Sequence, residues 1–237
     1  MSERPAGFTA VMAQRAPIDP DSLDYFPTPP WAARAGGEIV RRLDPLAQTC
    51  WEPAAGGGHM AWGLSDYFAE VSISDIHDHG GAMSPRFLLG DFLDPTFAPA
   101  IRPDWIITNP PFVKGEAFVR QAWRRARRGV AMLLRLQFLE GAARYRLFHE
   151  LPLHACAPFA ERVPMVKGRW DPTASSATAY AWFIWLKPGV DGYGSGPGLS
   201  FIAPGTKARL TKADDAARFG VVEKDPRQSE LVAERPG

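Results

Sequence analysis

Short apolar runs alternate with longer amphipathic stretches over the first 186 residues of the chain. The short runs predict β-strands, and the longer stretches predict helices that fill the gaps between them. We expect strands at residues 48–52, 71–75, 86–89, 104–108, 130–136, 154–159 and 180–186, and helices at residues 30–43, 59–68, 114–127 and 142–150. This order predicts an α/β fold, with a doubly wound and mostly parallel seven-stranded sheet and helices on both faces. In such sheets, ligands bind beyond the carboxyl ends of the strands.

A Gly/Pro-rich stretch begins at Pro188 and separates this pattern from the rest of the chain. Residues 188–198 are typical of a linker or an exposed loop, and residues 199–237 are expected to be partly ordered at best. We therefore expect one catalytic domain over residues 1–187, followed by a linker and C-terminal appendix over residues 188–237.

Length and composition favour one principal domain. At 237 residues, the chain can bury a sizeable core. It has no apolar run close to the length of a membrane span, and its first residues lack the regions of a signal peptide. We therefore expect a cytoplasmic protein without a membrane partner. Cys50 and Cys156 have no second Cys or His at zinc-binding spacing, so neither a disulfide framework nor a metal site is expected.

The net charge is only +1, but positive charge gathers in the middle of the chain. Residues 102–170 carry 13 Lys and Arg against 5 Asp and Glu. Much of this excess lies on or just after one predicted helix, at Arg120, Arg124, Arg125, Arg127 and Arg128. These residues either contact the phosphates of a polyanion or form a solvated helix face, and the pattern favours neither.

The single asparagine of the chain, Asn109, begins the run Asn109-Pro110-Pro111-Phe112 directly after a predicted strand. Prolines remove backbone N–H donors, so the local carbonyls and the Asn109 amide oxygen remain as hydrogen-bond acceptors. The Phe112 ring would offer a π-face beside them. Acceptors next to an aromatic platform suit an exocyclic NH2 group on a flat heterocycle, such as N6 of adenine. Asn-Pro also marks ordinary turns, which is the alternative interpretation.

A second motif, Trp-Glu-Pro-Ala-Ala-Gly-Gly-Gly-His-Met at residues 51–60, lies between a predicted strand and a predicted helix. Its small residues let a ligand approach the backbone, and the helix N-terminus presents free N–H groups. The motif fits neither the Gly-x-Gly-x-x-Gly dinucleotide pattern nor a phosphate-binding P-loop. Glu52, which precedes the glycines, favours an amino group or hydroxyls over a phosphate, as at the methionine end of S-adenosylmethionine.

Two acidic residues follow the next predicted strands. Asp75 is placed to accept hydrogen bonds from ribose hydroxyls, as the acidic residue after the glycine turn does in dinucleotide-binding folds. Asp91 is placed to accept from an adenine amino group, with Phe92 packed against the ring. Taken singly, each is more often a loop carboxylate than a ligand contact.

Together and in this order, the motifs resemble those of class I S-adenosylmethionine-dependent methyltransferases, and within them small phage or prophage-type adenine-N6 DNA methyltransferases. Residues 25–31 are similar to the N-terminal cofactor motif of the family, residues 52–58 to its glycine motif and residues 109–112 to its catalytic motif. Asp75 and Asp91 are similar to its acidic positions. Cofactor motifs precede the catalytic motif, as in the gamma class.

The resemblance implies a cofactor, a site and a reaction. Catalysis would rest on Asn109, Pro110, Pro111 and Phe112. The implied reaction methylates N6 of adenine in DNA after the base flips onto Phe112, with direct in-line attack once Asn109 and the Pro110 carbonyl accept both amino hydrogens. S-adenosylmethionine would be bound by residues of the cofactor motifs and strand ends, namely Phe26, Thr28, Pro29, Glu52, Ala54, Gly56, Gly58, Asp75, Ile76, Asp91, Phe92 and Asn109.

Departures from the family pattern concern the substrate. The usual Tyr of the catalytic motif is Phe112 here, which preserves stacking, and too few residues follow it for a large recognition domain. We therefore expect residues 161–178 to form a substrate-recognition loop, because they combine cationic side chains with Trp170. The alternative is a surface loop in which Trp170 caps the core. The expected substrate contacts are Phe112, Lys114, Arg162, Lys167, Arg169, Trp170 and Ser175.

Other roles stay open. The same motif occurs in methyltransferases that act on RNA adenine and on protein glutamine, because each substrate presents a planar NH2 group. The basic segment favours nucleic acid, and the motif order favours DNA. A nucleic-acid-binding protein that has lost activity is a further alternative, although intact Asn109, Glu52, Asp75 and Asp91 argue against it. A phage or restriction-modification setting is implied only by the resemblance.

Overall fold

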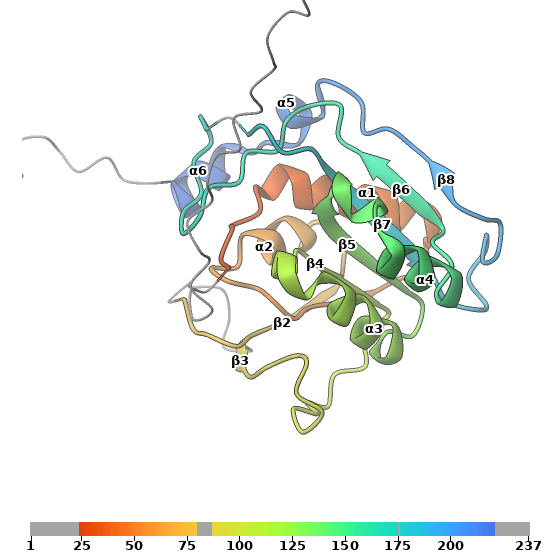
Figure 1. Cartoon of the computed structure of the whole chain (residues 1–237). Helices are drawn as coiled ribbons and strands as arrows, with labels where there is room; N and C mark the ends of the chain where they lie inside the picture. The colour runs from red at the N-terminus through yellow and green to blue at the C-terminus, as the bar shows by residue number, and fades with distance from the viewer. Residues whose placement is uncertain (1–23, 80–86, 175, 221–237) are drawn as a thin grey trace, which may run out of the picture.

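The computed structural model describes residues 24–79, 87–174 and 176–220 (Figure 1). The helices are α1 (Pro30–Leu43), α2 (His59–Leu64), α3 (Gly115–Arg125), α4 (Ala142–Glu150), α5 (Thr206–Leu210) and α6 (Ala213–Phe219). The strands are β1 (Thr49–Glu52), β2 (Glu70–Asp75), β3 (Phe87–Leu89), β4 (Trp105–Thr108), β5 (Gly129–Arg135), β6 (Ala155–Pro158), β7 (Tyr180–Leu186) and β8 (Gly198–Leu199). Two short 3-10 turns, η1 (Phe112–Lys114) and η2 (Leu136–Leu139), follow β4 and β5.

The strands form one sheet in the order β3-β2-β1-β4-β5-β7-β6-β8. β3, β2, β1, β4 and β5 are mutually parallel, β7 runs antiparallel to β5 and β6, and β8 pairs in parallel with β6. The predicted α/β fold with a mostly parallel sheet is confirmed. The described sheet has eight strands instead of the expected seven, because a two-residue strand such as β8 leaves no periodic pattern in a sequence.

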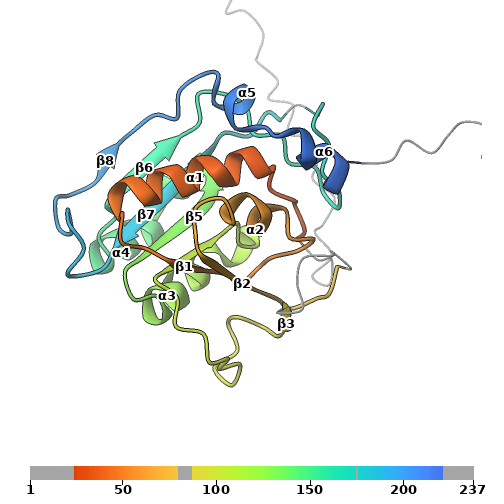
Figure 2. The same ribbon diagram turned by 180° about the vertical axis from the view of Figure 1, so that it is seen from behind.

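Helices cover both faces of the sheet. α1 and α2 lie on one face and α3 and α4 on the other, as the two opposite views show (Figures 1 and 2). The α1 face buries a core that includes Trp31, Leu64 and Trp182, and the α3 face buries a second core that includes Phe118 and Leu147. The centre of the sheet is therefore apolar on both sides, as the continuous burial of β4 and β7 also indicates.

Two of the predicted helices are shorter than expected. α2 ends at Leu64 instead of residue 68, where the chain turns toward β2. α3 ends at Arg125 instead of residue 127, because the N–H groups of Arg127 and Arg128 already donate to the carbonyls of Pro103 and Asp104, just before β4. These bonds start the pairing of β5 with β4 and so compete with a further helical turn.

The described residues after 188 pack on the α1 face. α5 contacts α1, and Arg34 of α1 donates hydrogen bonds to both carboxylate oxygens of Asp215 in α6, at 2.6 and 2.7 Å. Both side chains are 1% exposed. Burial alone would lower the pKa of Arg34, but the hydrogen bonds and charges of Asp215 and Asp66 raise it. We expected a linker and a tail that is partly ordered at best. The structure shows β8, α5 and α6 in the described part of this region. The expected division at residue 187 and the character of the tail stay predictions.

Candidate active site and cofactor pocket

A cavity lies at the carboxyl ends of β1, β2 and β4. Parallel strands end at the same edge of a sheet, so residues that are distant in sequence meet there. Glu52, Asp75 and Asn109 line the cavity directly after or at the ends of these strands, and residues 24–28 close one side. Concave sites with a few polar groups at strand ends are where folds of this kind bind small molecules.

The Asn109 amide has a defined orientation. Its Nδ2 atom donates hydrogen bonds to the Phe26 carbonyl and to Thr28 Oγ1, both at 3.1 Å, and lies 3.7 Å from the sulfur of Met165. Its Oδ1 atom is buried and has no hydrogen-bond partner in the described part of the chain. Because its surroundings use the NH2 group as a donor, the oxygen is the free end of the amide. Asn109 therefore presents an unused acceptor at the cavity.

Glu52 presents a second unused acceptor. Its side chain is 2% exposed, and Oε2 has no partner among the residues that the structure describes. Burial, and secondarily the charge of Asp75, hold the pKa of Glu52 well above its usual range, although a hydrogen bond from the Ala61 backbone opposes them. A carboxyl group in this position binds a hydrogen-bond donor or a cation favourably, because either would offset its desolvation.

The N-terminal motif and Asp75 hold the glycine turn. The Gly56 N–H donates to Asp75 Oδ2 at 2.7 Å, and the Gly57 N–H donates to the Tyr25 hydroxyl at 3.1 Å. Gly56 has a φ of +51°, and a Cβ there would lie 2.3 Å from the Tyr25 ring. Only glycine fits this position. The predicted residue Ala54 and its neighbour Ala55 line the cavity, whereas Gly56 and Gly58 are not among its lining residues. The Asp75 carboxylate can accept further hydrogen bonds, so the structure is compatible with a contact to a ribose. That contact stays a prediction.

The other predicted cofactor residues lie around the same cavity. Asp91, Phe92 and Ile76 line it, and Ile76 is 54% exposed. Asp91 Oδ1 also accepts a hydrogen bond from the Leu93 N–H at 2.8 Å. Phe92 is almost fully buried between Trp51 and Phe118, with ring centroids 5.1 Å from each. Phe26 and Thr28 line the cavity as well, while Pro29 is buried just before α1 and accepts the first helical hydrogen bonds.

The motif at residues 109–112, which we expect to be catalytic, leads from β4 into η1. Pro110 is buried, Pro111 and Lys114 line the cavity, and Phe112 is half-buried. The Phe112 N–H donates to Asp24 Oδ2 at 2.8 Å, and its ring lies 5.1 Å from that of Phe26. Sequence reasoning expected an open π-face, but the guanidinium carbon of Arg135 lies 4.0 Å from the Phe112 centroid and covers one side of the ring. No motif identified Arg135, which is the last residue of the otherwise buried strand β5.

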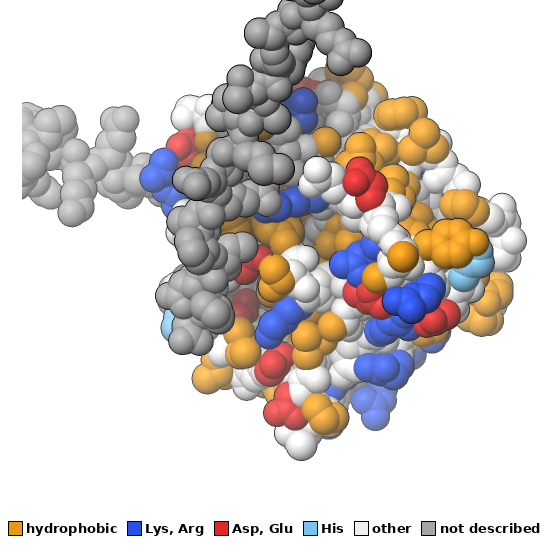
Figure 3. Space-filling view, viewed as in Figure 1, with side chains coloured by type: hydrophobic (Ala, Val, Ile, Leu, Met, Phe, Trp, Pro, Cys, Tyr) orange, Lys and Arg blue, Asp and Glu red, His pale blue; other side chains and the backbone are white. Residues whose placement is uncertain are grey.

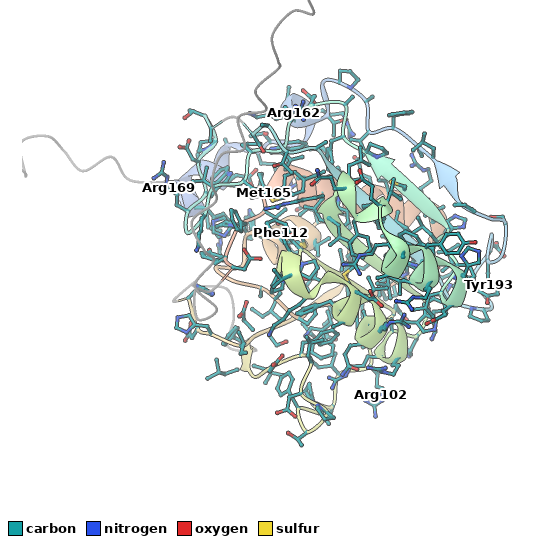
Figure 4. All side chains as sticks on the ribbon, viewed as in Figure 1. Arg102, Phe112, Arg162, Met165, Arg169 and Tyr193 are labelled. Carbon is teal, nitrogen blue, oxygen red and sulfur yellow. The ribbon has the colours of Figure 1, made fainter. Side chains whose placement is uncertain are left out.

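Some residues of the expected recognition loop, 161–178, contact residues of the site. Met165 contacts Asn109, and the Gly168 N–H donates to the Tyr25 carbonyl at 2.9 Å. Figure 4 shows Met165 close to Phe112 in projection. Arg162, Lys167 and Arg169 are exposed on this loop, where Arg169 lies 3.5 Å from Asp171 and Arg162 donates to the Ala177 carbonyl. Ser175 lies outside the described residues.

Trp170 corrects the sequence-based interpretation. Its side chain is 5% exposed and packs edge-on against Phe219 of α6 and against His59, with centroids 6.4 and 6.2 Å apart. Its ring is therefore not available for stacking on a base in this structure, and the core-capping alternative describes it better. The partner that covers it, Phe219, comes about 50 residues later in a segment without a recognisable pattern.

His59 is a pocket residue that sequence reasoning did not single out. It lines the cavity at the start of α2 and stacks on Phe219, with ring centroids 4.1 Å apart and planes at 27°. Burial lowers the pKa of His59 to about 4, so the ring is neutral at pH 7. Its Nδ1 atom has no partner among the described residues.

The basic helix is engaged within the molecule. Arg120 pairs with Glu116 and Glu150, and the two arginines that follow α3 pair with Asp104 and Asp44. Figure 3 shows Lys and Arg side chains over α3 and α4 interspersed with Asp and Glu. Arg125 stacks on Trp51 and Phe92, and burial lowers its pKa. These contacts favour a structural role for this face over phosphate binding.

Within the described ranges 24–79, 87–174 and 176–220, no group of three or more His, Cys, Asp or Glu is arranged to hold a metal ion. None of the described helices is both long and apolar enough to span a membrane. Cys50 and Cys156 are both buried and free.

The arrangement of these elements is similar to that of solved methyltransferase structures. A class I S-adenosylmethionine-dependent methyltransferase of Listeria monocytogenes, described as putative, matches with a TM-score of 0.56 and 12% identity, over 82% of this chain and 71% of that one. A type I restriction-modification methyltransferase subunit of Streptococcus thermophilus matches with a TM-score of 0.53 and 14% identity, over 69% of this chain. This chain spans 45% of the length of that subunit.

A putative RNA methyltransferase of Pyrococcus horikoshii also matches, with a TM-score of 0.51 and 16% identity, over 66% of this chain and 83% of that one. No protein-family model matches the sequence, and no curated protein matches it significantly. At these identities the likeness is one of fold. The chain has the Rossmann-like fold of class I methyltransferases, with its cavity at the strand ends where such folds bind ligands.

Proposed function

We propose that this protein transfers a methyl group from S-adenosylmethionine to the N6 amino group of adenine in DNA. One observation carries the proposal: the buried and unpartnered Oδ1 atom of Asn109, fixed in orientation, lies in the same cavity as the unpartnered carboxyl of Glu52. A planar amine on one side and a cofactor with an amino group on the other would satisfy both acceptors.

The residues around the cavity fit S-adenosylmethionine. Glu52 would accept from the methionine amino group, whose positive charge offsets the cost of the buried carboxylate. Asp75 would accept from the ribose, and Asp91 with Ile76 and Phe92 would hold the adenine. When bound, this cofactor supplies an electrophilic methyl group carried on a sulfonium. The chain's task is then to position and activate the amine.

Activation of the amine follows from the geometry at Asn109. The lone pair of an adenine amino nitrogen is delocalised into the ring, so it is a weak nucleophile. Acceptance of its two hydrogens by Asn109 Oδ1 and the Pro110 carbonyl would localise that lone pair and direct it. Phe26 and Thr28 hold the Asn109 NH2 group, and the oxygen cannot turn away without losing these bonds. Phe112 would replace the stacking lost when the base leaves the duplex.

DNA is the favoured substrate among three that share a planar NH2 group. The order of motifs and the exposed cations Arg162, Lys167 and Arg169 beside the site support nucleic acid. The likeness to a restriction-modification subunit is consistent with DNA, and that to a putative RNA methyltransferase keeps RNA adenine as the second candidate. We place the reaction in the cytoplasm, in a phage or restriction-modification setting. An inactive binding protein would not need to keep both unpartnered acceptors buried.

The test is a transfer assay with S-adenosylmethionine that carries a labelled methyl group. Separate reactions contain unmethylated DNA made by enzymatic amplification, RNA and a protein extract, and each product is digested and identified by mass spectrometry. N6-methyladenine in DNA supports the proposal. Label only in RNA adenine or in glutamine keeps the chemistry but replaces the substrate. Binding of the cofactor without label in any product contradicts the proposed activity.

Asn109→Ala should lower the turnover number by at least about a thousandfold, because it removes the acceptor that acts on the amine. The dissociation constant of the cofactor, measured by calorimetry, should change by less than about fivefold. Met165→Leu is a matched control, since it removes the sulfur contact to Asn109 and leaves the amide oxygen in place. An Asn109→Ala enzyme with near-normal turnover would refute the assignment.

A further inference from the structure

Arg135 lies beside the Asn109–Phe112 motif without an ion-pair partner among the residues that the structure describes. Its guanidinium lies over the Phe112 ring, and its Nε atom is buried without a hydrogen-bond partner in the described part of the chain. No carboxylate of the described residues forms an ion pair with it, whereas Arg34, Arg120 and Arg128 each have at least one. Arg135 is thus a half-buried cation with an unused donor beside the catalytic motif.

The neighbours of Arg135 are fixed by the sheet. Arg135 ends β5 directly opposite Tyr180 of β7, whose side chain is buried. Burial raises the pKa of Tyr180, and the neighbouring Arg135 guanidinium opposes that rise. Asp24, the carboxylate beside Phe112, accepts a hydrogen bond from the Phe112 backbone. Among the described residues, Arg135 therefore has a neutral hydroxyl as a neighbour and no carboxylate within ion-pair distance.

An unpaired cation in a partly buried position costs free energy, and groups of this kind gather at functional sites. The planar guanidinium of Arg matches the oxygens of a phosphate and can donate to two of them at once. An adenine stacked on Phe112 would bring the phosphates of its own nucleotide close to the guanidinium that lies on this ring. The Arg135 guanidinium, a hydrogen-bond donor suited to phosphate, therefore lies next to the place where the target nucleotide would bind.

We propose that Arg135 is a substrate-binding residue that contacts a phosphate flanking the target adenine. The proposal rests on the proposed function and narrows it, because a nucleic acid supplies this phosphate and a protein glutamine does not. Arg135 would act in substrate binding, before methyl transfer, because its contact with the nucleic-acid backbone holds the extruded nucleotide over Phe112.

The first test compares Arg135→Met with Arg102→Met in steady-state methyl transfer to amplified DNA. Both changes remove one Arg charge and keep an unbranched side chain. Arg102 is exposed and lies far from Phe112 (Figure 4), and its one hydrogen bond within the described residues goes to the neighbouring Ile101 carbonyl. Arg135→Met should raise the KM for DNA about tenfold and reduce the slope of log KM against log salt by about one, with the KM for S-adenosylmethionine unchanged. Arg102→Met should change each value by less than about twofold.

A second test does not need turnover. Binding of deoxyadenosine 5′-monophosphate and of deoxyadenosine is measured by NMR titration, with saturating S-adenosylhomocysteine to fill the cofactor pocket. The intact protein should bind the monophosphate more tightly than the nucleoside, and Arg135→Met should abolish that preference. Arg135→Lys should keep part of it, because the charge remains and only the planar donor pair is lost.

The outcomes separate the two proposals. If the intact protein methylates DNA and Arg135→Met leaves the KM and the salt slope unchanged, this inference is wrong and the proposed function stands. A fall in kcat alone, with both of those values unchanged, would make Arg135 a positioning residue for Phe112 and also overturn it. If the intact protein methylates only glutamine, both proposals fail.

Discussion

At the scale of single residues, the site is defined by polar atoms that the protein buries and leaves without partners. The Asn109 and Glu52 oxygens are two of the six buried side-chain atoms of this kind in the described residues. Most buried polar groups in folded proteins are satisfied, and so each exception calls for an explanation. Here both exceptions line one cavity, which makes a ligand the simplest explanation.

Glu52→Gln should separate two effects of the buried carboxyl group, namely its effect on the stability of the fold and its contribution to cofactor binding. The raised pKa of Glu52 means that the ligand-free fold favours the protonated carboxyl group. The resulting contribution to the free energy of unfolding is fully present below the pKa of Glu52 in the unfolded chain. It is lost as the pH rises toward the pKa in the folded protein. At about pH 8, the Gln variant should be more stable than the parent, because an amide does not have to be kept neutral against the solvent pH. The difference should vanish near about pH 4, and cofactor affinity should fall at least about tenfold.

The measurements are urea unfolding at both pH values and calorimetric titration with the cofactor. Glu38→Gln is the control with the opposite sign, because hydrogen bonds from Arg209 lower the pKa of Glu38. It should lose a little stability at about pH 8 and leave cofactor binding unchanged. Equal effects of the two variants would contradict the role assigned to Glu52.

At the scale of elements, the sequence predicts those helices and strands that are long enough to show a hydrophobic periodicity, and those site segments that carry a recognisable motif. The helices at 30–43 and 142–150 and the strand at 180–186 appear with the expected bounds. β8, α5 and α6 are too short to show a period, so they were missed. The error on Trp170 has the same origin, because only the packing of α6 shows that its ring is covered.

The contact between α2 and α6 should make stability depend on pH. Burial lowers the pKa of His59 to about 4, so the unfolded chain binds a proton in the window between about 6.5 and 4 that the folded chain excludes. The contribution of the neutral, buried His59 ring to the free energy of unfolding is therefore lost as pH falls through that window. Between about pH 7 and pH 5, it should lower the free energy of unfolding by about 2 kcal/mol. His59→Gln should remove that part of the pH dependence in guanidinium unfolding curves, and an unaltered pH profile would contradict the assignment.

At the scale of the whole molecule, the residues after 188 are joined to the first helix by a buried ion pair. Arg34 binds Asp215, Asp66 and the Leu210 carbonyl, and the Trp62 indole donates to Asp215 at 3.1 Å. Asp215 carries α6, whose Phe219 stacks on His59 at the cavity. The C-terminal segment is thereby connected to the cofactor side of the site through named contacts.

Asp215→Ala should destabilise the fold by about 3 kcal/mol, because it leaves Arg34 buried with Asp66 as its remaining carboxylate. Hydrogen exchange should become faster over residues 206–219, and cofactor affinity should fall as the wall behind His59 loosens. Arg209→Met, which breaks an exposed pair with Glu38, should cost less than about 1 kcal/mol. If the two variants are equally stable, α6 does not depend on the buried pair.

The Arg34–Asp215 contact joins residues that are 181 positions apart. Contacts between such distant segments have a high entropic cost of closure and tend to form late in folding. During synthesis on the ribosome, all the residues that line the cavity emerge before α6 does, so they exist for a time without Phe219 packed behind His59. The support behind His59 is therefore added last, and we expect newly made chains that lack α6 to bind the cofactor more weakly than the full chain.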